Sequence, residues 1–249
     1  MYSIFDVIKK RNPNLLQTYL SNNSDNSDIN TKNENGDTPL HKVILSDNIV
    51  MTNLLLSAGS KIDARDKNGR TPLHIAVMMG LTNIVKLLLS HGSSINPIDN
   101  ERRTPLHWAV EKNYTLIIKS LLQHHASINI RDKKGHTPLY IAVSEGLLHT
   151  AEILLQYNAN PNIPENTGFT PLHYSILHKN IPFIQLLISY RANPSIKDNH
   201  EITPLNFASS DPEFYKLITN LIENNKFTQT LPDSITSDYL DAFYNESLL

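Results

Sequence analysis

The sequence predicts an all-α solenoid, in which short helix pairs stack one behind another. Three observations support this fold. The tripeptide Thr-Pro-Leu recurs six times, each copy begins 33 residues after the last, and a similar pattern of apolar residues follows each copy. The copies begin at Thr38, Thr71, Thr104, Thr137, Thr170 and Thr203.

The first half of each copy predicts a short helix. Thr suits the N-cap, and Pro suits the first helical position because its missing N–H would have no partner there. A small residue four positions after Pro, such as Ala76 or Ala109, allows close helix contact. The helix is expected to end at residues that tolerate a left-handed backbone. These residues are Asp47, Gly80, Asn113, Gly146 and Asn180.

The second half predicts another helix and a polar turn. In "NIVKLLLS", residues 83–90, apolar residues recur at helical spacing, and "DARDKNGR", residues 63–70, leads into the next copy. Some copies lack the expected turn glycine, so either a non-glycine is strained there or the turn differs. The replacing residues are Arg102, His125, Asn158, Arg191 and Glu201. One helix pair cannot bury its apolar face alone, whereas stacked pairs form a continuous core.

The pattern "DKNGRTPLHIA", residues 66–76, and the 33-residue period closely resemble the ankyrin repeat over about residues 33–226. The resemblance implies an ankyrin-repeat solenoid of antiparallel helix pairs with projecting β-turn loops and a concave binding surface. It also implies that the motif histidines belong to a hydrogen-bond network between repeats. These histidines are His41, His74, His107 and His173. We expect three parts: a degenerate N-terminal capping helix pair and polar loop (1–32), six repeats (33–226) and a tail (227–249).

The composition of the chain argues against several classes of function. The net charge of −2 gives no overall positive field for nucleic acid, and no apolar run reaches the roughly 18–20 residues that cross a bilayer. The chain has no cysteine, and all eight glycines fall on repeat turns, so no glycine remains for a phosphate-binding loop. The start lacks a secretory pattern, which favours the cytoplasm. We therefore expect a monomer that is not an enzyme and has no cofactor.

A second set of histidines could be a candidate for binding a metal. His91 and His124 occupy equivalent positions in successive repeats, and Tyr157 and Tyr190 continue the column. Neighbouring helices lie roughly 8–10 Å apart, whereas zinc needs each nitrogen at about 2.0–2.1 Å. The prediction is therefore no metal site, and the column belongs either to a recognition surface or to packing along the stack.

Partner binding is expected where the repeats differ from one another, in the loops before Thr-Pro and at the ends of the first helices. The alternative is a variable, solvated loop edge. Apolar Met78 and Met79 beside basic loops favour a protein partner with an acidic or partly hydrophobic segment. Loop acids such as Asp66 and Asp99 interrupt the basic patch and disfavour nucleic acid. The predicted partner-binding residues are Arg70, Met78, Met79, Arg103, Glu111, Lys112, Lys133, Lys134, His136, Phe169, Leu177 and His178.

The tail has two interpretations. Ile235, Tyr239 and Phe243 lie at helical spacing among acidic residues, which predicts an amphipathic helix that caps the last repeat. Alternatively, Leu231-Pro232 with Ile235 resembles the opening of an F-box-like segment, seen at the C-terminus of some viral and intracellular-bacterial ankyrin proteins. That resemblance implies an effector-type adaptor, delivered into a host cytoplasm, that links a bound protein to ubiquitin-ligase machinery.

Overall fold

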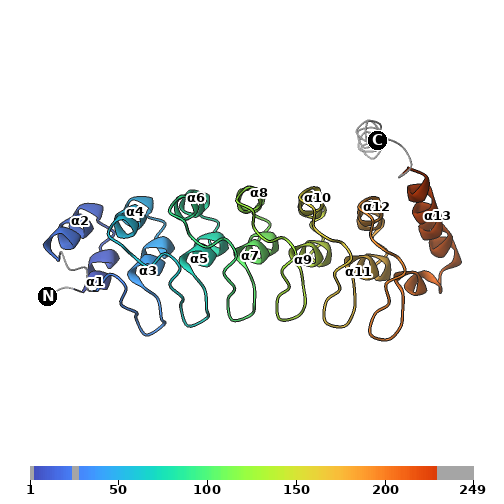
Figure 1. Ribbon diagram of the computed structural model, residues 1–249, viewed down its shortest axis with the longest axis horizontal. Helices are drawn as coiled ribbons and strands as arrows, with labels where there is room; N and C mark the ends of the chain where they lie inside the picture. Colours follow the sequence, from blue (N-terminus) through green and yellow to red (C-terminus); the bar gives the residue numbers. More distant parts are fainter. Residues whose placement is uncertain (1–2, 24–27, 229–249) are drawn as a thin grey trace.

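Two rows of helices run along the molecule, and loops project from one row away from the other (Figure 1). The computed structural model describes residues 3–23 and 28–228, and in these ranges it contains helices and no strand. The loop-side helices are α3 (Pro39–Leu45), α5 (Pro72–Met78), α7 (Pro105–Glu111), α9 (Pro138–Ser144) and α11 (Pro171–Leu177). The outer helices are α4 (Ile49–Ser57), α6 (Thr82–Ser90), α8 (Thr115–Gln123), α10 (Leu148–Gln156) and α12 (Ile181–Ser189).

The Thr-Pro caps are confirmed. Thr71 has an extended backbone with φ −90° and ψ 166°, and Pro72 begins α5. Asp47 and Asn113 end their helices with positive φ, as expected. The expectation for Asn180 is wrong: the left-handed residue is Lys179, with φ 50°, and Asn180 caps α12 instead by accepting a bond from the Phe183 N–H. Lys179 stands nine residues after its motif Thr, as Asp47 and Asn113 do, so spacing decides the position.

The turns without glycine keep the same geometry as the others. Arg102 and Glu201 have φ of 59° and 62°, and Arg191 has φ of 64°. The alternative of differing turns is therefore wrong, and a left-handed non-glycine costs roughly 1–2 kcal/mol.

The two ends depart from the regular unit. The N-terminal pair is α1 (Ile4–Lys9) and α2 (Pro13–Asn22), as expected. In the sixth copy the first helix is not α but a short 3-10 helix, η1 (Pro204–Ala208). The following helix, α13 (Pro212–Thr228), begins nine residues after Thr203, where other outer helices begin eleven residues after theirs, so less chain remains for the first helix.

Helix α13 continues two residues past the predicted boundary at 226, so that boundary falls inside a helix. The predicted capping helix and docking segment of the tail lie outside the described residues. Within the described ranges, no helix has the length and apolar character needed to span a membrane.

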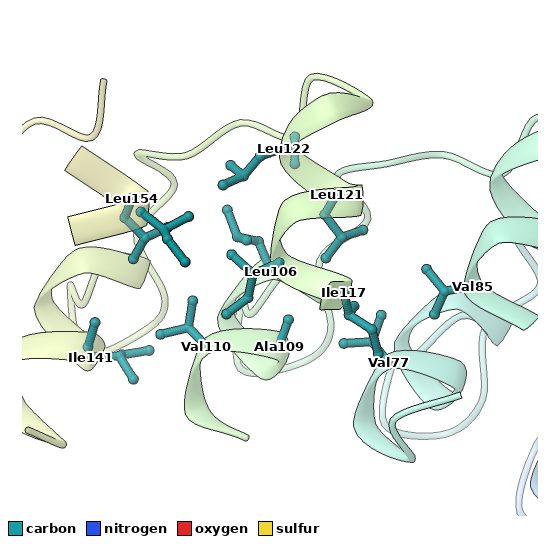
Figure 2. Packing of buried hydrophobic residues seen from close by; sticks show 14 of the residues in the cluster. Val77, Val85, Leu106, Ala109, Val110, Ile117, Leu121, Leu122, Ile141 and Leu154 are labelled. Carbon is teal, nitrogen blue, oxygen red and sulfur yellow. The ribbon is translucent and has the colours of Figure 1, made fainter. Parts of the chain in front are cut away.

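One apolar core runs through the stack. The motif leucines Leu40, Leu73 and Leu172 are 0% exposed, and Ala76, Ala109 and Ala142 let the loop-side helices approach closely. Figure 2 shows the cluster around α7 and α8, where Leu106, Val110 and Leu121 lie among side chains from the neighbouring repeats. Full burial of such a side chain contributes about 1.5–3 kcal/mol, so each repeat depends on its neighbours.

Candidate protein-binding surface

The motif histidines join neighbouring repeats. The His74 Nδ1 accepts a hydrogen bond from the Thr71 backbone N–H at 3.1 Å, and its Nε2 lies 3.0 Å from the Arg103 carbonyl oxygen, 29 residues further along. A carbonyl oxygen can only accept, so Nε2 carries the proton. His41, His107 and His173 make the equivalent bonds to Arg70, His136 and Ile202. The network implied by the resemblance is confirmed.

These histidines are held neutral. Burial lowers the pKa of His74 from its ordinary 6.5 to about 4, and the bond to the Arg103 carbonyl opposes this only in part. Burial likewise lowers the pKa values of His41, His107 and His173. Each side chain is 0% exposed, so these groups hold the repeats together and do not face a ligand.

The histidines of the second column lie on the surface. His91 and His124 are exposed, and the Nδ1 of each lies within 3.0 Å of a carbonyl oxygen of its own helix, that of Leu87 or Ser120. Groups of three or more His, Cys, Asp or Glu placed to hold a metal ion are not found in the described part of the chain.

The projecting loops form a rigid edge. Asp66 Oδ1 accepts the backbone N–H groups of Asn68 and Arg70, both at 2.8 Å, which closes the loop before α5. The tip of this loop bonds to the next, with the Asn100 N–H 2.9 Å from the Asn68 carbonyl oxygen. The contact is close, because a Cβ on Gly69 would lie 3.0 Å from the Asn100 nitrogen. Side chains on these loops are therefore presented from a fixed backbone.

A groove of about 570 Å³ lies between the first and second repeats, and we call it the N-terminal groove. It brings together three predicted partner-binding residues, Arg70, Met78 and Met79. The other residues that define it here are apolar Leu45 and Ile75 and charged Asp37, Lys42 and Lys67. Leu45 is 43% exposed and Met79 is 51% exposed, so an apolar surface is open to a partner beside three cationic side chains.

The predicted residues of the third repeat are engaged within the protein. The Arg103 guanidinium pairs with Glu111, lies 3.7 Å from Asp132 and stacks over the Trp108 ring at 4.9 Å. Trp108 is partly buried and donates from Nε1 to Asp99 at 3.0 Å. Trp108 is therefore a packing residue of the third repeat.

The other predicted residues are spread along the surface. Lys112 lies 3.8 Å from Glu111, and Lys133 lies 3.2 Å from Glu101. Lys134 is exposed, as are Leu177 and His178 at the end of α11. The structure does not gather them into one site.

Two of the predicted partner-binding residues, His136 and Phe169, pack their rings against other side chains of the protein. The His136 ring stacks on Tyr140 with centroids 4.8 Å apart. The Phe169 ring lies 5.2 Å from that of His173 and 5.4 Å from that of Phe207, so the scaffold itself uses this aromatic side chain. Phe169 therefore belongs to the packed scaffold, and its role in binding stays a prediction.

The predicted partner-binding set contains three of the eight residues that define the groove and lacks the other five. Lys42 and Leu45 belong to the groove, and they stand at the same positions of the first repeat as Ile75 and Met78 of the second. Met78 was predicted by comparing equivalent positions of the repeats, and the same comparison could therefore have found Leu45. Two arginines of the loops, Arg65 and Arg131, bond to neighbouring loop segments.

The family models give an independent result. A model of ankyrin repeats in three copies matches residues 4–99, 51–132 and 94–165, and a model of ankyrin repeats in many copies matches residues 153–208. The chain belongs to the ankyrin repeat family. Ankyrin repeats are typically non-catalytic scaffolds for protein–protein interaction.

Solved structures share the fold of this ankyrin repeat chain. The ankyrin repeat domain of Bcl-3, a member of the IkappaB protein family, has a TM-score of 0.81 at 24% identity, over 88% of this chain and 98% of that one. An ankyrin repeat domain from Acinetobacter baumannii AYE has a TM-score of 0.68 at 29% identity, over 76% of this chain and 97% of that one. The search of curated proteins returned no match.

Proposed function

We propose that this ankyrin repeat chain is a non-catalytic scaffold that binds a partner protein through its loop-side surface, formed by the projecting loops and the exposed ends of the loop-side helices. The N-terminal groove is the observation that carries the proposal. It combines exposed apolar side chains with cations on a backbone fixed by bonds between loops. Met is enriched in interface cores and adapts to irregular partners, so Met78 and Met79 suit this role.

The histidine chemistry supports binding over catalysis. The four motif histidines are buried, neutral and bonded on both ring nitrogens, so none has a nitrogen left to exchange a proton with a substrate. In the third repeat, the charges of Arg103 and Glu111 are paired with each other. The surface thus offers contact area and charge, which a protein partner can use.

Capture from cell lysate with variants on the two helix rows tests this proposal. We expect Met78→Ser with Met79→Ser to reduce the yield of captured partner at least about tenfold, as truncation of central interface side chains does. The matched control is Val50→Ser with Leu116→Ser, which truncates side chains 55% and 72% exposed on outer helices. Thermal unfolding of each variant checks the fold. If the control loses its captured partners and the groove variant keeps them, the partner binds the outer helices and the proposed surface is wrong.

The adaptor alternative depends on sequence beyond Thr228. Deletion of residues 229–249 removes no residue of a described helix, and thermal unfolding of the shortened chain checks its fold. If the chain is an adaptor, the deletion removes ligase subunits from the captured set but keeps the partner. If partner and ligase subunits both persist, the tail is not the docking segment.

A further inference from the structure

The N-terminal groove has an apolar residue at the end of two adjacent loop-side helices, unlike the two repeats that follow. Leu45 and Met78 each stand seven residues after their motif Thr. The equivalent residues of the next two repeats are polar, Glu111 and Ser144. Two neighbouring apolar contact points, one repeat apart, therefore occur here and not in the middle of the array.

The groove also carries positive charge that the protein leaves open. Lys67 is exposed at a loop tip and has no ion pair among the described residues. Lys42 lies 3.3 Å from Asp37, whose side chain is only 11% exposed, and Arg70 lies 2.8 Å from Asp66. Lys133, which is equivalent to Lys67 two repeats along, is paired with Glu101. An anionic ligand in the N-terminal groove would thus find an open cation at Lys67.

Resting on the function proposed above, we propose that the N-terminal groove binds a short segment of a partner protein in the polyproline II conformation, with two apolar side chains three residues apart and acidic residues beside them. Neighbouring helices pack roughly 8–10 Å apart, and a polyproline II segment rises about 3.1 Å per residue with three residues per turn, so side chains three residues apart lie on the same face. Three residues of ligand therefore span one repeat, which places one apolar side chain near Leu45 and the next near Met78. The ligand carboxylates pair with Lys67 and meet the exposed parts of Lys42 and Arg70.

Selection of random 12-residue peptides displayed on phage tests this chemistry on the full chain. The groove variant is Lys67→Glu with Met79→Ser. The control is Lys119→Glu with Leu116→Ser on the outer helix α8, which makes the same charge change at an exposed lysine and truncates a side chain 72% exposed, where Met79 is 51% exposed. We expect acidic peptides with apolar residues three apart to be enriched on the wild type and the control, but not on the groove variant.

One enriched peptide, synthesised with a fluorescent label, gives the quantitative readout. We expect its Kd to rise at least about tenfold on the groove variant and less than about twofold on the control. Replacing its acidic residues by Asn and Gln weakens binding, and replacing its apolar residues by Ser abolishes it. Enrichment of basic peptides, equal binding to both variants, or unchanged binding without the apolar residues would overturn the proposal.

Other occupants give distinguishable results. A dimer of the wild type that is lost in the groove variant would assign the groove to a second copy, and groove-dependent binding of a labelled single-stranded RNA would assign it to nucleic acid; either overturns the proposal. If captured protein depends on Met78 and Met79 but no acidic peptide is enriched, the peptide chemistry fails and the scaffold function stands. If neither protein capture nor peptide binding depends on the groove residues, the peptide proposal and the scaffold proposal both fail.

Discussion

The joint between the second and third repeats and the joint between the fourth and fifth use the same position differently. His74 ties its repeat to the Arg103 carbonyl through Nε2, whereas Tyr140 stands at the equivalent position and packs between the rings of His136 and Tyr174. Thr71 and Thr137 nevertheless have nearly the same backbone, with ψ of 166° and 163°. The Thr-Pro cap and the buried leucine therefore set the repeat, and the third helical residue only selects how repeats are joined.

Low pH should give the largest difference in stability between the histidine joint and the tyrosine joint. The His74 pKa is lowered to about 4, so between pH 6.5 and about 4 the unfolded chain binds a proton at this residue that the folded chain does not. The free energy of unfolding is then unaffected above pH 6.5 and falls as the pH drops through this window. For His74 the loss is on the order of 3 kcal/mol. Burial raises the pKa of Tyr140 to about 12, so its joint adds no such dependence.

Urea unfolding between pH 7.5 and 4.5 measures this effect. Carboxylates titrate at the acid end in every variant, so the informative quantity is the difference between wild type and His74→Leu. We expect the stability of the variant to fall less steeply with decreasing pH. Parallel curves for the two proteins would show that the His74 joint does not titrate as its burial requires.

At neutral pH, His74→Leu and Tyr140→Phe should differ in cost. Leucine keeps apolar volume but leaves the buried Thr71 N–H without its acceptor and removes one bond to the Arg103 carbonyl, so we expect a loss of about 2–3 kcal/mol. Tyr140→Phe keeps the ring packing and should change stability by less than about 0.5 kcal/mol. Denaturant unfolding at pH 7 measures both. Similar costs would mean that ring packing, and not the hydrogen bonds, holds the histidine joints.

The repeat fold could be predicted from sequence because its causes are local and repeated. A Thr-Pro cap, a buried leucine and a turn residue at a fixed spacing recur in each of the first five copies, so one error such as Asn180 is corrected by comparison with Asp47 and Asn113. The sixth copy broke the rule because Pro212 starts the last helix early. The effect of this early start on the preceding helix depends on three-dimensional packing.

The binding surface was predicted less completely, because a list of variable positions does not say which side chains satisfy each other. Arg103 and Glu111 are eight residues apart and pair across the helix. Phe169 fills a space beside Phe207, which belongs to the next repeat. Met79 is exposed and Met78 is half-buried at the end of α5, and the spacing already placed both residues at this helix end.

The smallest predicted effect concerns the turns before the motifs, where the second and third repeats again differ at one position. Gly69 and Arg102 are equivalent, with φ of 75° and 59°, and Arg102 is exposed. Arg102→Gly relieves roughly 1–2 kcal/mol of left-handed strain but adds about 0.5–1 kcal/mol of chain entropy to be lost on folding. We expect a net gain of about 0.5–1 kcal/mol, seen as a higher Tm. Asn158→Gly is the control, since Asn tolerates this conformation and should gain little. A lower Tm for Arg102→Gly would mean that the arginine side chain stabilises its loop by more than the strain it brings.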